Sequence, residues 1–186
     1  QPVIVENKPG VAGIVATEAA KASPPNGTTL ILQPLAPMVA HPYTYAKLNY
    51  DLMKDLEAAA LIATVCQILA IHPSLPAKSI REFVTFARSR REELTYATTG
   101  AGSTPHLTTE MFRMQTGLKL LHVPYKGTPL ALNDLIAGNI SFMFVNILTV
   151  MQHVSSGRLR ALGITSAKRS PIAPQIPTVA GNLRRL

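Results

Sequence analysis

Residues 98–106 read Thr-Thr-Gly-Ala-Gly-Ser-Thr-Pro-His and combine hydroxyl side chains with two closely spaced glycines. Pro105 suits the first position of a helix, Thr104 suits its N-cap, and glycine lets a backbone approach a ligand closely. Free N–H groups at the start of a helix bind anions, assisted by the helix dipole. The stretch therefore predicts either a well-capped connecting turn or a carboxylate or phosphate site made by Thr99, Gly100, Gly102, Ser103, Thr104 and His106.

Catalytic and metal-binding patterns fit the chain less well. Pro105 stands where the dinucleotide-binding fingerprint needs its third glycine, and the sequence contains no Walker motif. Ser103 lies three residues before His106, which raises a hydrolase hypothesis, but neither a nucleophile elbow nor an acid partner accompanies the pair. The five histidines are not closely paired and Cys66 is the only cysteine. We therefore predict no enzymatic activity, no metal and no cofactor.

Two further polar positions follow apolar stretches that we expect to be strands. Tyr125 comes after residues 118–123, and Asn146 comes after residues 140–145. Open α/β sheets bind ligands at the carboxyl ends of their strands, so both residues are candidates for a ligand site. The alternatives are a packed tyrosine beside a solvated turn for Tyr125 and a helix N-cap for Asn146.

Composition limits the class of protein. With 186 residues, of which 47% are hydrophobic and 15% charged, the chain can bury a substantial core. Proline, glycine or charged residues interrupt every apolar run before it reaches the roughly 18 to 20 residues that span a membrane, so we expect no membrane-embedded segment. A net charge of +8 favours anionic ligands or partners. The basic residues are scattered, tryptophan is absent and aromatic residues make up 5%, which argues against nucleic acid.

Alternating patterns of strands and helices predict α/β layers with mainly parallel strands. Helices are expected after residue 10, from Ser79, over 105–117 and 128–138, and before Gly157. Residues 39–55 are expected to be irregular, with Tyr43, Tyr45 and Tyr50 used for packing, and Cys66 is expected to be buried. Strands are expected at residues 2–6, 28–32, 94–97, 118–123, 140–145 and 159–165, with one or two more inside 56–71.

Several ordered segments resemble the solute receptors of tripartite tricarboxylate transporters, the Bordetella uptake receptor group, over about residues 1–180. The resemblance implies a two-lobed type II periplasmic-binding-protein fold, with residues 1–70 and 166–186 in one lobe and 71–165 in the other. The segments that carry it are Pro-Val-Ile-Val-Glu-Asn-Lys-Pro-Gly (2–10), His-Pro-Ser-Leu-Pro-Ala-Lys-Ser (72–79), Gly-Ser-Thr-Pro-His (102–106), His-Val-Pro-Tyr-Lys-Gly (122–127) and Leu-Arg-Ala-Leu-Gly-Ile-Thr-Ser-Ala-Lys-Arg (159–169).

By this resemblance the protein is a periplasmic receptor that binds a small carboxylate between its lobes and delivers it to the membrane subunits of a transporter. The loop that matches residues 99–106 grips the carboxylate, and Tyr125 and Asn146 border the cleft. Val145 departs from the Phe-Asp-Asn pattern of many relatives. The glycine-rich first loop that the family places before Gln1 is absent from the sequence, which also lacks a signal peptide, so we expect truncation at both ends and an incomplete first lobe.

Two other functions remain open at this point. Similar two-lobed folds sense small effectors in transcription regulators, so the chain is alternatively a sensing module. It is otherwise a truncated product without binding activity. Calorimetric titration with carboxylates separates the receptor from a product without binding activity. A DNA-reading helix-turn-helix encoded before Gln1 would favour the sensing module.

Overall fold

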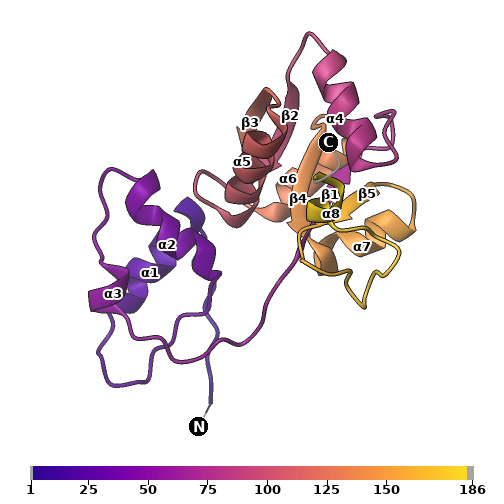
Figure 1. The fold of residues 1–186 in the computed structure, drawn as a ribbon. Coiled ribbons are helices and arrows are strands. Elements are labelled where there is room, and N and C mark those ends of the chain that lie inside the picture. Colours follow the sequence, from indigo (N-terminus) through magenta and orange to yellow (C-terminus); the bar gives the residue numbers. More distant parts are fainter. Residues whose placement is uncertain (1, 184–186) are drawn as a thin grey trace.

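The computed structural model describes residues 2–183, and Gln1 and residues 184–186 lie outside the described part. Its centre is a five-stranded sheet with the order β3-β2-β4-β1-β5 (Figure 1). Strand β2 is parallel to β3 and to β4, whereas β1 is antiparallel to both of its neighbours, so the predicted α/β class is confirmed, with β1 reversed. The strands are β1 (Gln67–Ile71), β2 (Leu94–Thr98), β3 (Leu120–Pro124), β4 (Phe142–Asn146) and β5 (Arg160–Ile164).

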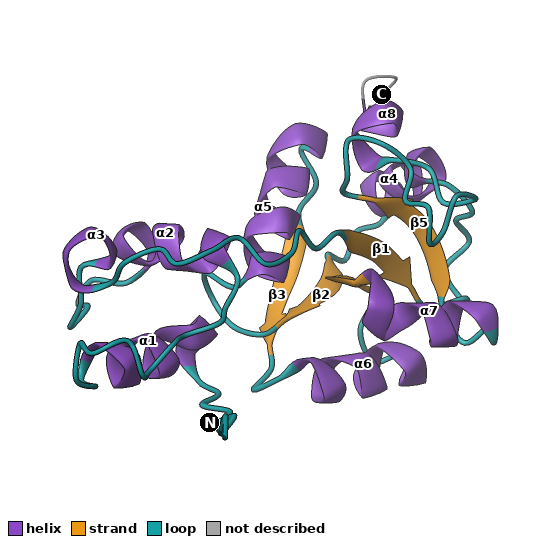
Figure 2. Ribbon diagram, turned by 90° about the horizontal axis from the view of Figure 1, so that it is seen from below, coloured by secondary structure: helices purple, strands orange, loops and turns teal. Residues whose placement is uncertain are grey.

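Helices cover both faces of this sheet (Figure 2). One face carries α4 (Ile80–Ser89), α5 (Thr104–Thr116) and α8 (Val179–Leu183), and the other carries α6 (Thr128–Ala137) and α7 (Ile147–Ser155). Successive strand residues point to opposite faces, so each strand contributes to two separate cores. Burial of these apolar side chains is the main stabilising term of the region.

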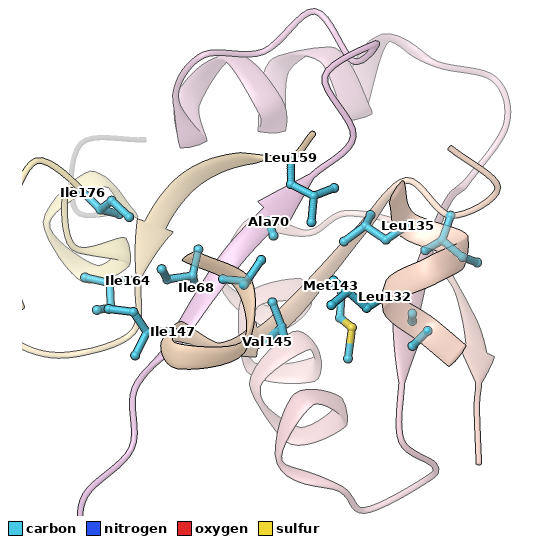
Figure 3. Close-up of a cluster of buried hydrophobic side chains, with 14 of the residues drawn as sticks. Ile68, Ala70, Leu132, Leu135, Met143, Val145, Ile147, Leu159, Ile164 and Ile176 are labelled. Atoms are coloured by element: carbon cyan, nitrogen blue, oxygen red, sulfur yellow. The ribbon is translucent and has the colours of Figure 1, made fainter. Parts of the chain in front are cut away.

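The two cores follow the alternation along β1. Ile68 and Ala70 join the cluster beneath α6 and α7, which Figure 3 shows in close-up. Leu69 and Ile71 join the cluster beneath α4 and α5. All four side chains are fully buried, so β1, which is paired between β4 and β5, contributes to both cores.

Residues 2–66 form helices joined by extended segments beside the sheet (Figure 1). The predicted strands at residues 2–6 and 28–32 are wrong for the described residues, because no ladder includes these segments and Val3 and Leu30 are 88% and 80% exposed. Strand propensity alone cannot form a sheet without pairing partners. The helices are η1 (Val11–Gly13), α1 (Ile14–Lys21), α2 (Leu35–Thr44) and α3 (Leu52–Asp55).

Other expectations need correction in detail. Residues 39–55 are not irregular throughout, because α2 and α3 occupy much of the segment. Residues 56–66 are extended and mostly exposed, so only the end of the apolar run 56–71 forms a strand. Tyr50 is buried as expected, whereas Tyr43 is 91% exposed and Cys66 is only partly buried.

Residues 67–70 and the described part of the C-terminal tail pack with the sheet, although the sequence-based division assigned both to the first lobe. Strand β1 is paired between β4 and β5, and Ile164 forms a bridge with Thr178. Ala173 and Ile176 are buried in the core beneath α6 and α7. The division into two lobes stays a prediction, and its residues 1 and 184–186 lie outside the described part of the chain.

Candidate ligand-binding site

The loop between β2 and α5 is folded tightly by its own backbone. Gly100 and Gly102 have φ angles of +114° and +75°, in the region that glycine adopts more readily than other residues. The Ser103 N–H donates to the Gly100 carbonyl at 3.2 Å, and the Leu107 N–H donates to the Ser103 carbonyl at 2.9 Å. The loop thus turns directly into the first turn of a 13-residue helix.

The start of α5 leaves donors available. The N-cap is Ser103 rather than the expected Thr104, and no side chain caps the helix. Pro105 stands in the first turn as predicted. Because the first helical bond comes from Leu107, the N–H groups of Thr104 and His106 have no intrahelical acceptor. A carboxylate at this end would receive hydrogen bonds and a favourable dipole interaction.

The hydroxyl groups of the loop divide into two kinds. Ser103 is 3% exposed, and its hydroxyl donates to the Gly100 carbonyl at 2.7 Å, so it is used within the loop. Thr99 and Thr104 are partly exposed, and within residues 2–183 their hydroxyls have no hydrogen-bond partner. Thr99 and Thr104 are therefore better placed than Ser103 to contact a ligand directly.

His106 has a structural connection to the loop and to β3. The Gly102 N–H donates to His106 Nδ1 at 3.2 Å, and the rings of His106 and His122 lie 4.6 Å apart. His122 Nε2 lies 2.6 Å from Thr98 Oγ1, which also accepts from the Gly100 N–H. Burial is the main cause that lowers the pKa of both histidines, which favours neutral rings.

A polar cluster continues from these histidines along α5 and β2. Tyr96 stacks on His122 and donates to Glu110 Oε1 at 2.9 Å, and Arg113 pairs with Glu110 at 2.7 Å. Burial would raise the pKa of Glu110, but the hydrogen bonds from Arg113 and Tyr96 hold it below its usual range. Burial and the bond to Glu110 raise the pKa of Tyr96. This cluster borders an open hollow of about 440 Å³.

Tyr125 lies at the expected edge of the sheet, but its hydroxyl is already bonded. The Tyr125 N–H donates to the Thr98 carbonyl, and the Tyr125 hydroxyl donates to Asp134 Oδ2 at 2.6 Å. Burial, followed by the bond to Asp134, raises the pKa of Tyr125 to about 12. The residue therefore positions β3 against β2 and α6, as the packing alternative predicted.

Asn146 and Gln67 are paired at the same edge of the sheet. The side-chain oxygen of Asn146 accepts from the Leu148 N–H at 2.9 Å, which confirms the N-cap alternative. Gln67 is opposite Asn146 in the β1–β4 register and is 8% exposed, and its side-chain oxygen is buried without a partner. Sequence reasoning missed Gln67, although a single amide that follows the apolar run 61–66 was a usable signal.

The N-terminal helices reach the candidate loop at one point. The Tyr45 hydroxyl donates to the Ala101 carbonyl at 2.7 Å. A Cβ atom on Gly102 would lie 3.0 Å from Thr44 Oγ1. The end of α2 therefore packs closely on the turn between β2 and α5.

Two negative findings concern residues 2–183. Within this range, no group of three or more His, Cys, Asp or Glu residues is arranged to hold a metal ion. No helix in it is both long enough and apolar enough to cross a membrane.

The fold is that of periplasmic binding proteins. A structure described as a periplasmic transporter superposes with a TM-score of 0.91 at 32% identity, over 98% of this chain and 61% of that one. An R. palustris protein solved with adipate gives 0.90 at 32% identity, over 96% and 60%. MatC from Rhodopseudomonas palustris with bound malate gives 0.88 at 28% identity, over 97% and 62%.

Residues 1–184 match the family described as the tripartite tricarboxylate transporter family receptor, and the chain belongs to this family. Protein BugT of Bordetella pertussis is 34% identical over 181 residues, which make up 97% of this chain and 56% of BugT. The chain thus spans about half the length of the curated relatives it matches. Membership of a transporter-receptor family confirms the predicted resemblance and the non-enzymatic class.

Proposed function

We propose that this chain belongs to an extracytoplasmic receptor that captures a small dicarboxylate and delivers it to the membrane subunits of a tripartite transporter. The ligand would lie between the N-terminal helices and the edge of the sheet, and the receptor would act in the periplasm. Closure of the two lobes on the ligand would accompany binding. Two relatives of the same fold, solved with adipate and with malate, support the ligand class.

The observation that carries the proposal is the start of α5. Gly100 and Gly102 fold the loop, and the helix then begins without a capping side chain. The N–H groups of Thr104 and His106, with the hydroxyls of Thr99 and Thr104, supply several donors for one carboxylate. Each hydrogen bond to a charged group contributes about 1.5 to 3 kcal/mol to binding. A few such bonds give an affinity that still lets the receptor release its ligand.

Isothermal titration of the chain with adipate, malate and succinate tests this function. We expect saturable heat with at least one diacid, and none with the corresponding diamide, which carries no charge. A folded chain that binds none of the three acids would refute the proposal.

A further inference from the structure

Two histidine rings from different elements contact the segment 98–102, which leads from β2 into α5. His106 lies in the first turn of α5, and His122 lies in β3. Their ring centroids are 4.6 Å apart, and both residues are partly buried. Each ring shares one hydrogen bond with the segment, and the function proposed above uses neither ring.

The bond to His106 requires an unprotonated Nδ1. Its partner is the backbone N–H of Gly102, which can only donate, at 3.2 Å. Neutral imidazole has one acceptor nitrogen, so Nδ1 is that acceptor and the ring proton is on Nε2. Protonation of Nδ1 would place two donors face to face, and the bond would be lost. Gly102, with a φ angle of +75°, is thereby held at the last bend before the helix only by a neutral ring.

The bond to His122 sets the direction of a hydroxyl proton. Thr98 Oγ1 lies 2.6 Å from His122 Nε2 and accepts the Gly100 N–H at 3.1 Å. The other acceptor within reach of the Thr98 hydroxyl is the Gly100 carbonyl at 3.4 Å, which already accepts from the N–H and the hydroxyl of Ser103. The Thr98 hydroxyl therefore donates to a neutral His122. Protonation of this ring would turn the hydroxyl toward an acceptor that is already occupied.

Charges of both signs lie around the two rings. Glu110 attracts protons to both rings, but Arg113 pairs with it at 2.7 Å and Tyr96 donates to it. Burial lowers the pKa of both histidines, and the neighbouring ring lowers that of His122 further, so both rings are neutral at neutral pH. Tyr45, from α2, bonds to the segment itself. The titratable groups that line the hollow beside the rings are Glu93, Tyr96, Glu110, Arg113 and Lys119.

We propose that His106 and His122 are positioning residues that hold the segment 98–102 in its anion-binding form only as neutral rings, so that mild acid releases the segment and weakens ligand binding. The rings act through Gly102 and Thr98. Direct contact between a ring and the ligand would have the opposite sign, because a carboxylate favours a charged imidazole beside it. The effect on binding rests on the function proposed above, whereas the effect on the segment does not.

Calorimetry with adipate and with malate, at about pH 7.5 and about pH 5.5, tests the effect on binding. The double variant His106→Asn, His122→Gln offers an acceptor oxygen in place of each acceptor nitrogen at both pH values, so its affinities report the ionisation of the ligand alone. Relative to this variant, the affinity of the unsubstituted chain should fall at least roughly 5-fold in acid, since one linked proton gives up to about 10-fold per pH unit. His153→Gln, in α7 on the other face of the sheet, should leave this fall unchanged.

NMR titration without ligand tests the segment directly. The amide signals of Gly100 and Gly102 should shift with pH together with the imidazole signals of His122 and His106. His106→Asn should abolish the shift of the Gly102 amide, and His122→Gln that of the Gly100 amide.

Two results would overturn the proposal: an affinity that rises in acid relative to the double variant, or glycine amide signals that do not follow the histidine titration. Absence of binding of both acids at about pH 7.5 would instead refute the proposed function. In that case the amide titration still decides whether the two rings hold the segment.

Discussion

The hydroxyl of Tyr45 donates a hydrogen bond of 2.7 Å to the carbonyl oxygen of Ala101, across 56 residues of sequence. This bond joins the end of α2 to the loop that precedes α5. It is the kind of contact that sets how far the N-terminal helices can open away from the sheet.

We predict that Tyr45→Phe loosens this contact with little loss of stability. The bond is exposed, so its removal should cost no more than about 1 kcal/mol. Amide hydrogen exchange over residues 99–104 should become faster, as measured by mass spectrometry. Tyr43→Phe is the matched control, because Tyr43 is 91% exposed and should leave exchange in the loop unchanged. Equal exchange in both variants would contradict the prediction.

Two variants should show which hydroxyl stabilises the loop and which one contacts the ligand: Ser103→Ala and Thr104→Val. Ser103→Ala removes the bond to the Gly100 carbonyl and should lower the free energy of unfolding by about 1 kcal/mol. Thr104→Val removes a free hydroxyl, so the affinity for a dicarboxylate should fall while stability in urea stays nearly constant. Urea unfolding and calorimetry on both variants check this, and the reverse pattern would return Ser103 to the role first expected of it.

Gly102→Ala should be more destabilising than Gly117→Ala. Both glycines have positive φ angles, at a cost of about 1 to 2 kcal/mol for an added side chain. The new Cβ at position 102 also meets Thr44 Oγ1 at 3.0 Å, whereas the space at Gly117 is open. The difference between the two free energies of unfolding measures the contact of α2 with the loop. If the two variants were equally stable, this contact would be absent in solution.

The pH dependence of stability should reflect one buried histidine, His41, and two partly buried ones, His106 and His122. Burial is the first cause that lowers the pKa of His41, His106 and His122 from the ordinary 6.5. The unfolded chain then binds more protons than the folded chain below pH 6.5, so this contribution is present above 6.5 and is lost as pH falls. Urea unfolding at several values between about pH 5 and 7.5 should show stability rising with pH. His106→Gln should reduce the slope, and a flat profile would contradict the prediction.

The sequence predicted those elements whose signals are local. Ser79 caps α4 by accepting from the Glu82 N–H, as its spacing indicated, and the predicted strands at residues 94–97, 118–123, 140–145 and 159–165 form with small shifts at their ends. The strands at residues 2–6 and 28–32 failed because pairing depends on a partner strand, which a local pattern does not report.

The candidate site was predictable in part for the same reason. The turn at residues 98–106 has a local signature, so its place at the start of α5 was foreseen. The bond between Ser103 and Gly100, the bond between Tyr125 and Asp134, and the pairing of Gln67 with Asn146 depend on contacts that only the folded chain defines.

The exposed extended segments at residues 2–6, 28–32 and 56–65 affect how readily copies of the chain associate in solution. Extended apolar segments that pair with no neighbouring strand tend to associate with one another. In these segments Ile4, Leu32 and Leu61 are each about four-fifths exposed. The net charge of +8 opposes that association by repulsion between copies, with a range of about 10 Å at 0.1 M salt. Ionic strength should therefore control whether solutions of this chain remain monodisperse.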